Sequence, residues 1–248
     1  MLFLKVLHLT AIPQINENLA QTKVIVYKSR VDSATLKQTA EEMKNELFVK
    51  RFSKPKPEDI HVVSVEKHYE PYVLVDAKYK IDYFTKKVYT FEVTEKANEV
   101  QILGESFKPQ RVPIPDSEPE QFRRVVSIEG NELSVYEDKT YFILDKSGRE
   151  ISPDQVPIAP SEDNPKKILK EFGKNAERVK VSNREVLSIA KNKIINRPGD
   201  VDTVEDELFQ VTEYAIIYNP VYRITFRNTK TKEEKTVSVD GVTAEIIK

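Results

Sequence analysis

Two segments of the chain alternate apolar and polar residues with a period of two. Residues 73–83 place apolar side chains at every odd position, with charged residues such as Lys80 at most even positions. Residues 222–227 repeat this arrangement. Because successive side chains of a strand point to opposite faces of a sheet, the pattern predicts two half-buried strands. We expect each to end in a polar turn, near residues 84–87 and 228–235, and a further strand to follow.

A helical period of apolar residues precedes each of these strands. Asp32 and Ser33 stand before the first predicted helix, and either is suited to cap its free backbone amides. The second begins at Ser182 and has Glu185 three residues later, which is the pattern of a capping box. We therefore expect two amphipathic helices. Their apolar faces consist of Leu36, Ala40, Met43 and Leu47 in the first and Val186, Ile189, Ala190 and Ile194 in the second.

The two helix-and-strand segments share a Tyr-x-Pro mark, formed by Tyr69 and Pro71 in the first and by Tyr218 and Pro220 in the second. The spacing from helix to mark is nearly the same in both, which indicates an internal duplication. Chance likeness between two generic α+β stretches is the alternative. A proline at a strand entrance or bulge, beside a buried ring, explains the marks structurally. A ligand-binding role is the other interpretation.

Prolines concentrate between the two segments, where eight of the 14 fall within residues 109–165. They flank residues 123–151, in which short β-rich runs are separated at 130–131, 137–139 and 145–148. This pattern predicts a meander of three or four strands. We expect an α+β protein with two related helix-plus-antiparallel-sheet units, at residues 1–106 and 166–248, joined by a proline-flanked β-meander linker domain at residues 107–165.

The C-terminal segment, residues 221–248, resembles the PepSY-type module, a small helix-plus-sheet unit found in peptidase propeptides and related proteins. The likeness lies in the alternating strand, the polar hairpin, and Asp240 leading to Thr243 and Ile246. The family commonly has glycine after this threonine, whereas the chain has Ala244. The resemblance reaches the first segment only through the internal repeat. It implies a noncatalytic module that binds or inhibits another protein.

The composition excludes several kinds of site. The chain has no cysteine, which excludes disulfides, thiolate zinc sites, iron–sulfur clusters and cysteine nucleophiles. The three histidines are not accompanied by other candidate ligands at the spacing of a metal-binding motif. No two of the six glycines lie close enough to form a phosphate-binding loop. We therefore expect no metal, no cofactor and no catalytic residue. Asp240 is the best single candidate for acid–base chemistry, but we favour a turn residue that caps its own backbone.

Apolar runs are short. The longest, residues 214–218, has five residues, against roughly 18 to 20 needed to cross a bilayer. Residues 1–12 are apolar but interrupted by Lys5 and His8, and we expect a buried first strand there rather than an export leader. A cytoplasmic location and no membrane partner follow as the default. Abundant Glu and Lys without Cys is typical of heat-adapted proteins.

Charge is distributed unevenly, although Lys and Arg (39) nearly balance Asp and Glu (40) over the whole chain. Residues 166–197 contain ten basic and three acidic residues, and an acidic stretch, residues 200–213, follows directly. A basic face of this kind suits phosphates or an acidic partner. A solvated surface neutralised by the acidic stretch is the alternative that we favour. The ten basic residues are Lys166, Lys167, Lys170, Lys174, Arg178, Lys180, Arg184, Lys191, Lys193 and Arg197.

These observations favour a noncatalytic macromolecule-binding protein over an enzyme. The first hypothesis is a protein-binding adaptor or inhibitor, in which sheet edges and hairpins of the repeated PepSY-like units serve as docking surfaces. The second is a nucleic-acid or ribosome-associated protein that binds through residues 166–197. An enzyme that uses carboxylates and tyrosines in a cleft between the repeats is a third. The partner and the oligomeric state do not follow from the sequence.

Overall fold

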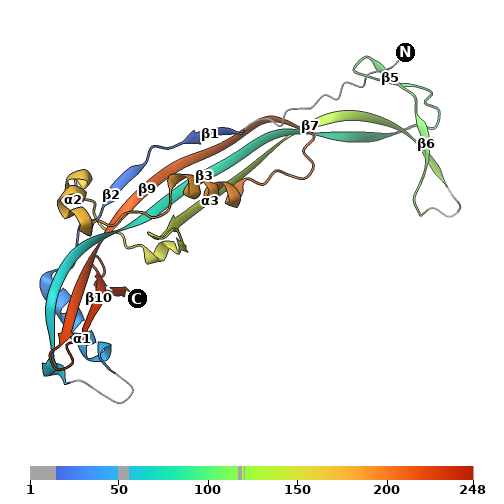
Figure 1. Ribbon diagram of the computed structural model, residues 1–248. Coiled ribbons are helices and arrows are strands. Elements are labelled where there is room, and N and C mark those ends of the chain that lie inside the picture. Colours follow the sequence, from blue (N-terminus) through green and yellow to red (C-terminus); the bar gives the residue numbers. More distant parts are fainter. Residues whose placement is uncertain (1–14, 50–55, 117–118, 120, 248) are drawn as a thin grey trace, which may run out of the picture. The chain divides into compact units, whose positions relative to one another are not determined.

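The protein has an α+β fold, as expected (Figure 1). The computed structural model describes residues 15–49, 56–116, 119 and 121–247. The strand expected within residues 1–12 lies outside this part of the chain. The α-helices are α1 (Ser33–Leu47), α2 (Pro165–Phe172) and α3 (Asn183–Ile194), and the short 3-10 helices are η1 (Pro57–Asp59), η2 (Pro153–Gln155) and η3 (Gly173–Asn175).

The described residues form one nine-stranded sheet with the order β11-β10-β9-β3-β7-β6, to which β1 and β2 add on β9 and β8 adds on β7. β10 pairs antiparallel with β9 and β11, whereas β2 runs parallel to β9. β4 and β5 form a separate antiparallel pair. The strands are β1 (Asn16–Leu19), β2 (Lys23–Val26), β3 (Ile60–Val93), β4 (Val100–Ile102), β5 (Glu105–Phe107), β6 (Gln110–Pro113), β7 (Phe122–Leu144), β8 (Glu150–Ile151), β9 (Thr203–Asn228), β10 (Glu234–Asp240) and β11 (Ile246–Ile247).

The chain divides into two compact units that are built from non-contiguous segments. Unit 2 contains α1, α2, α3 and the helix-covered parts of the sheet. Unit 1 consists of the described part of Met1–Asn16 with Lys80–Glu137 and Asn196–Leu208, and unit 2 consists of Glu17–Tyr79, Asp138–Ile195 and Phe209–Lys248.

Three expected turns are absent from the described strands. β3 continues through residues 84–87, and β7 continues through residues 130–131 and 137–139, so the predicted breaks at these positions are wrong. Gly130 lies inside a strand because the ring of Tyr89 covers it: a Cβ at this position would lie 3.3 Å from the ring. A glycine inside a strand often marks a close approach of this kind.

The alternating segments form strands whose buried positions follow the expected period. In β3, Val73, Val75, Ala77, Tyr79, Ile81 and Tyr83 are all buried, which confirms the first pattern. In β9, Ile224 and Phe226 are buried and Tyr222 is partly buried. Earlier in β9 the buried positions are odd-numbered, including Phe209, Val211 and Ile217. The covered positions of β9 therefore change from odd to even along the strand.

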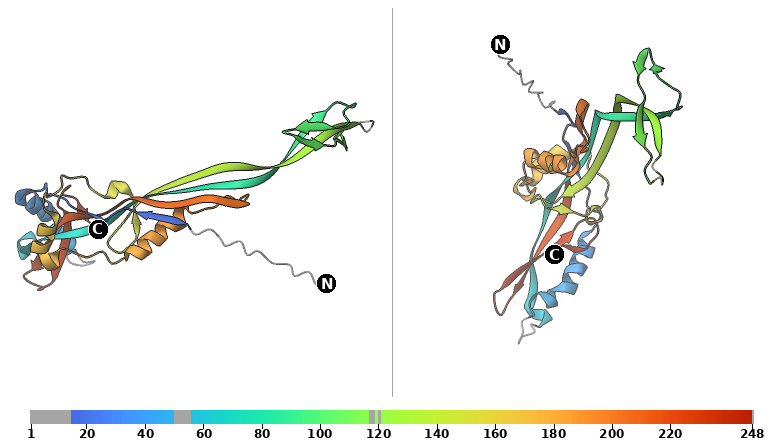
Figure 2. Two further views of the ribbon diagram at one scale, coloured as in Figure 1. Left: turned by 90° about the horizontal axis from the view of Figure 1, so that it is seen from above. Right: turned by 90° about the vertical axis from the view of Figure 1, so that its right-hand side faces the viewer.

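Both predicted helices form, and each buries the face that was expected. The backbone amide of Thr35 donates to Asp32 Oδ1 at 2.8 Å, so that Asp32 caps α1. In α3, Ser182 and Glu185 form the predicted capping box, and Val186, Ala190 and Ile194 are buried. α1 precedes β3 in the chain but packs largely on the hairpin of β9 and β10 (Figure 2). Its Leu36 and Ala40 share one core cluster with Ile60, Ile224, Phe226, Val237 and Val239.

The turns on either side of β10 have the same construction. In each, an Asx side chain accepts hydrogen bonds from the backbone amides two and three residues later: Asn228 in the first and Asp240 in the second. The fifth residue of each turn has a positive φ, 61° at Lys232 and 67° at Ala244. Asp240 is thus the self-capping turn residue that the sequence favoured. The left-handed conformation occurs at Ala244, where the PepSY family commonly has glycine.

Replacing Ala244 by glycine is expected to stabilise the protein, because an alanine at positive φ is strained and glycine is not. The free energy of unfolding of Ala244→Gly, measured by urea denaturation, is expected to rise by about 0.5 to 1 kcal/mol. Ala190→Gly, in the middle of α3, is the matched control and is expected to lower stability by about 1 kcal/mol. A loss of stability in Ala244→Gly would contradict the strain at this turn.

Candidate functional site

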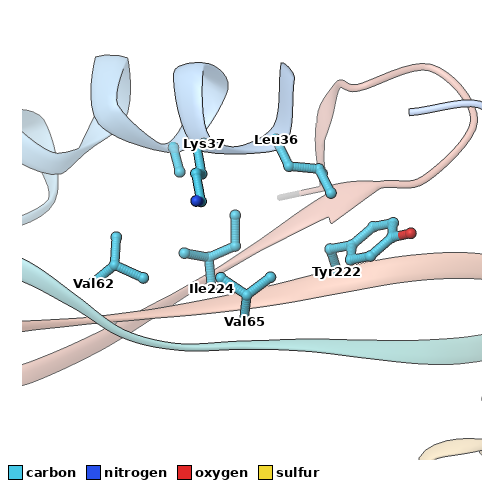
Figure 3. Close-up of a pocket in the computed structure, with 7 residues that line it drawn as sticks. Leu36, Lys37, Val62, Val65, Tyr222 and Ile224 are labelled. Carbon is cyan, nitrogen blue, oxygen red and sulfur yellow. The ribbon is translucent and has the colours of Figure 1, made fainter. Parts of the chain in front are cut away.

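An apolar groove opens in unit 2 between α1 and the sheet (Figure 3). Its volume is about 170 Å³. Figure 3 shows side chains of α1 on one wall and side chains of β3 and β9 on the other. The groove is lined by Leu36, Lys37, Ala40, Val62, Val65, Tyr222 and Ile224.

The floor of the groove is part of the hydrophobic core, since Leu36, Ala40 and Ile224 are buried members of the cluster beneath α1. Ala40 contributes only a methyl group at the point where the helix faces the sheet. Tyr222 is held in place through its hydroxyl group, which lies 3.0 Å from Ser29 Oγ. The walls are therefore fixed by the packing of the fold, which favours binding without a large ordering cost.

The strand side of the groove exposes apolar surface to solvent. Val62, Val63 and Val65 of β3 are 39%, 49% and 44% exposed. Neighbouring residues of a strand point to opposite faces. The exposure of both Val62 and Val63 therefore means that the described residues cover each face of this part of β3 only in part. Clustered exposed apolar residues of this kind mark interaction surfaces more often than isolated ones do.

The chemistry of the groove suits binding rather than catalysis. Lys37 is the one charged residue among those that line it. A volume of about 170 Å³ lies below the range of roughly 300 to 1,000 Å³ typical of small-molecule sites. The groove has room for one aliphatic or aromatic side chain, such as the anchor residues that fill pockets at protein interfaces.

The Tyr-x-Pro marks are found in tightly packed surroundings. Tyr69 is buried and packs edge-on against Phe172, with ring centroids 4.8 Å apart. Burial, and then Glu162 and Tyr222, raises the pKa of Tyr69 to about 12. Pro220 lies against Gly241, where a Cβ would approach the proline carbonyl oxygen to 2.8 Å. Neither Tyr69 nor Pro220 lines the apolar groove, whereas Pro71 lines a separate polar cavity.

The basic residues of segment 166–197 differ in their surroundings. Lys191 pairs with Glu17 at 2.6 Å, Lys193 pairs with Glu150 at 2.8 Å, and Arg197 pairs with Glu207 of the acidic stretch. Lys167 lies 3.9 Å from Glu171. In the described part of the chain, the other six have no acidic partner within ion-pair distance and are exposed; they are Lys166, Lys170, Lys174, Arg178, Lys180 and Arg184.

A closed ring of ion pairs, which sequence patterns alone did not predict, joins four segments of unit 2. Lys146, in the turn between β7 and β8, lies 3.1 Å from Glu70 and 3.0 Å from Glu177. Arg223 of β9 lies 2.8 Å from Glu70 and also pairs with Glu177. Glu70 is the middle residue of the first Tyr-x-Pro mark, which is the single sequence signal that pointed near this ring.

The ring shifts the pKa values of Glu177 and Lys146. Burial alone would raise the pKa of Glu177, but hydrogen bonds from Lys146 and Arg223 outweigh it and hold the pKa below its ordinary value. For Lys146, burial acts to lower the pKa, and hydrogen bonds to Glu177 and Glu70 raise it overall. The charged forms of Glu177 and Lys146 are thus stabilised by their partners in the ring.

Comparisons with protein-family models, with curated proteins and with solved structures return no match. None of the described helices is both long and apolar enough to cross a membrane. Among the described residues there is no group of three or more His, Cys, Asp or Glu side chains placed to hold a metal ion. The groove is therefore identified as the candidate site from its geometry alone.

The ion-pair ring predicts an acid-sensitive contribution of Glu177 to stability. Because its pKa is lowered in the folded state, this contribution is present above the unfolded pKa, near 4.5, and is lost as the pH falls through the folded pKa. Glu177→Gln is expected to lower the free energy of unfolding by about 1 to 2 kcal/mol at pH 7. The difference from wild type is expected to shrink as the pH falls below about 4.5.

Glu171→Gln is the matched control, since Glu171 is exposed and lies at the limit of ion-pair distance from Lys167. Its effect is expected to stay within about 0.5 kcal/mol. Urea denaturation at pH values from 3 to 7 measures both variants. An equal loss of stability at all pH values in Glu177→Gln would show that its charge does not hold the ring together.

Proposed function

We propose that the protein is a noncatalytic adaptor or inhibitor that docks an extended segment of another protein at the apolar groove beneath α1. The partner places one aliphatic or aromatic side chain in the groove, and an acidic residue beside that anchor pairs with Lys37. The observation that carries this proposal is the groove itself, together with the exposed valines that continue it along β3.

The size of the groove sets the expected strength of the interaction. Burying one large apolar side chain contributes about 1.5 to 3 kcal/mol, which corresponds to roughly 10- to 150-fold in affinity. An exposed lysine paired with one carboxylate adds at most about 1 kcal/mol. The anchor side chain therefore dominates, and an extended partner needs additional contacts along β3 to bind tightly.

We further propose that the helix-plus-strand segments are a duplication and that the C-terminal one is PepSY-like. In support, α1 followed by β3 and α3 followed by β9 repeat the order of a helix and a long strand. A helix across β9 and β10, and a turn at Asp240 that ends in a left-handed residue, are features that such a module would have. The implied role, binding or inhibition of another protein, is the same role that the groove supports.

A charged side chain placed in the groove is expected to abolish binding of the partner protein. Val65→Glu places a charge in the wall of the groove, whereas Ile158→Glu places the same charge at a site in unit 2 that is 84% exposed and outside the groove. Wild type and both variants serve as baits in parallel for nuclease-treated lysate of the source organism, washed across a salt series and read by mass spectrometry. One discrete protein is expected on wild type and Ile158→Glu and is expected to be lost from Val65→Glu, because burying an unpaired carboxylate in an apolar contact is costly.

If the partner stays bound to Val65→Glu, the docking surface is not the groove. Partners that appear only without nuclease and disappear at moderate salt would overturn the adaptor proposal. Thermal unfolding of the three baits checks that they are equally folded, which is expected because Val65 is 44% exposed.

The six unpaired cations favour a second candidate function, association with RNA. Lys174, Arg178 and Lys180 also line an open hollow of about 590 Å³ next to η3. Six phosphate contacts on a single strand give a slope of log affinity against log salt of roughly −4. This dependence distinguishes phosphate binding from docking at the apolar groove.

Charge reversal at the hollow tests this second function. If it holds, a labelled single-stranded RNA of about 20 nucleotides is expected to bind with steep salt dependence. The triple variant Lys174→Glu, Arg178→Glu and Lys180→Glu is expected to reduce the slope by at least about 2, since each lost phosphate contact removes about 0.7. Reversal of Lys86, Lys87 and Lys139, exposed lysines outside the segment, is the control. Equal binding by both triple variants would exclude the hollow as the RNA site.

A further inference from the structure

Unit 2 contains a second cavity, which shares no lining residue with the apolar groove. Its volume is about 780 Å³, within the range of roughly 300 to 1,000 Å³ found for small-molecule sites. The walls are formed by β3, by the turn between β7 and β8, by η2, by β9 and β10, and by the turn that joins β10 to β11. Polar side chains dominate these walls, unlike those of the groove.

The ionisable residues of the cavity carry an excess of negative charge. Its three cations are already paired: Lys146 and Arg223 belong to the ion-pair ring, and Arg149 contacts Asp145 at 2.7 Å. An anionic ligand would have to displace these carboxylates. The cavity is lined by the carboxylates of Glu70, Asp145, Asp154, Asp240 and Glu245 and by the cations of Lys146, Arg149 and Arg223.

Three carboxylates remain when the paired groups are set aside. Asp240 is fixed, because its Oδ1 accepts two backbone amides and its Oδ2 accepts Asn219 Nδ2 at 2.6 Å. Asp154 and Glu245 are exposed and have no ion-pair partner among the residues that the structure describes. Their charges are therefore available to a ligand that enters the cavity.

Tyr72 supplies an aromatic wall to the same cavity. It is partly buried, and within the described residues its hydroxyl group has no hydrogen-bond partner. Burial, and then the charges of Asp240, Glu70 and Asp145, raises its pKa to about 12. The ring consequently stays neutral at physiological pH. A neutral aromatic face near carboxylates attracts organic cations, by about 0.5 to 2 kcal/mol from the ring alone.

We propose that this cavity binds an organic cation through a primary ammonium or guanidinium group, held between the Tyr72 ring and the carboxylates of Asp154 and Glu245. The described residues hold no cluster of three metal-ligating side chains, which favours an organic cation over a metal ion. The site is independent of protein docking at the apolar groove, since the two cavities have separate walls.

The walls are preorganised for a ligand. Asp145 accepts the backbone amides of Ser147 and Arg149, and Asp240 closes the neighbouring turn in the same way. The ion-pair ring ties Glu70 of β3 to both Lys146 and Arg223. A ligand therefore orders few additional groups, which lowers the entropic cost of binding.

Titration calorimetry with the full chain at low ionic strength tests the proposal. Spermidine and the amide of the peptide Gly-Arg-Gly are the probes, and inorganic phosphate is the anionic control. We expect saturable binding of at least one cationic probe and none of phosphate. Tighter binding of the peptide would identify an arginine side chain as the natural source of the cation, and tighter binding of spermidine would identify a free polyamine.

Three variants locate the binding. The double variant Asp154→Asn and Glu245→Gln is expected to weaken the cationic probe by about 10-fold or more, and Tyr72→Leu by roughly 2- to 30-fold, the range for one cation–π contact. Glu171→Gln, which is outside the cavity, is expected to change the affinity less than about 2-fold. Because Asp154 and Glu245 are exposed, unfolding does not explain a loss in the double variant, and thermal unfolding verifies this. Absence of saturable binding, or equal binding by the double variant and Glu171→Gln, would overturn the proposal.

Discussion

The carbonyl oxygen of Gly241 holds together the part of the fold on which both candidate sites depend. It accepts the backbone amides of Arg30 and Val31 at 2.9 and 3.1 Å and the hydroxyl group of Ser29 at 3.0 Å. The segment before α1 is thereby fixed to the turn after β10. Position 241 itself must be glycine, because a Cβ would meet the carbonyl oxygen of Pro220 at 2.8 Å. One crowded contact thus sets where α1 lies on the sheet.

The two sites have separate walls and use opposite chemistry. α1 forms one wall of the apolar groove, and Val62 and Val65 belong to the opposite wall. Asp240 and Thr243, from the same turn as Gly241, line the polar cavity. The groove excludes charge apart from Lys37, whereas the cavity concentrates it. A protein with both surfaces is suited to hold a polypeptide and a charged ligand independently of each other.

Local features of the structure were largely predictable from the sequence, and non-local ones were not. The period of two in residues 73–83 identified the buried face of β3, and Ser182 with Glu185 identified the start of α3, because both signals lie within a few residues. The turn predicted at Gly130 was wrong, since the sequence does not reveal that the Tyr89 ring covers this glycine. Apolar periodicity also shows which face of α1 is buried but not that β9 and β10 bury it.

The candidate sites were missed for the same reason. The groove is a space left between α1 and two strands, so no single residue of the sequence indicates its presence. The ion-pair ring joins Glu70, Lys146, Glu177 and Arg223, which are far apart in a chain with 79 Lys, Arg, Asp and Glu residues in which no pair stands out. Asp240 was identified because an Asx turn is a local feature, although its place in the wall of a cavity is not.

The anchor at Gly241 also governs the order of events during synthesis. Ser29 and Gly241 are 212 residues apart, so α1 cannot reach its final position until the ribosome has released the turn after β10. At roughly 5 to 20 residues per second, the apolar face of α1 therefore stays uncovered for about ten to forty seconds after it emerges. Leu36 and Ala40 are exposed throughout this interval, when a chaperone or a neighbouring nascent chain competes with β9 and β10 for the same surface.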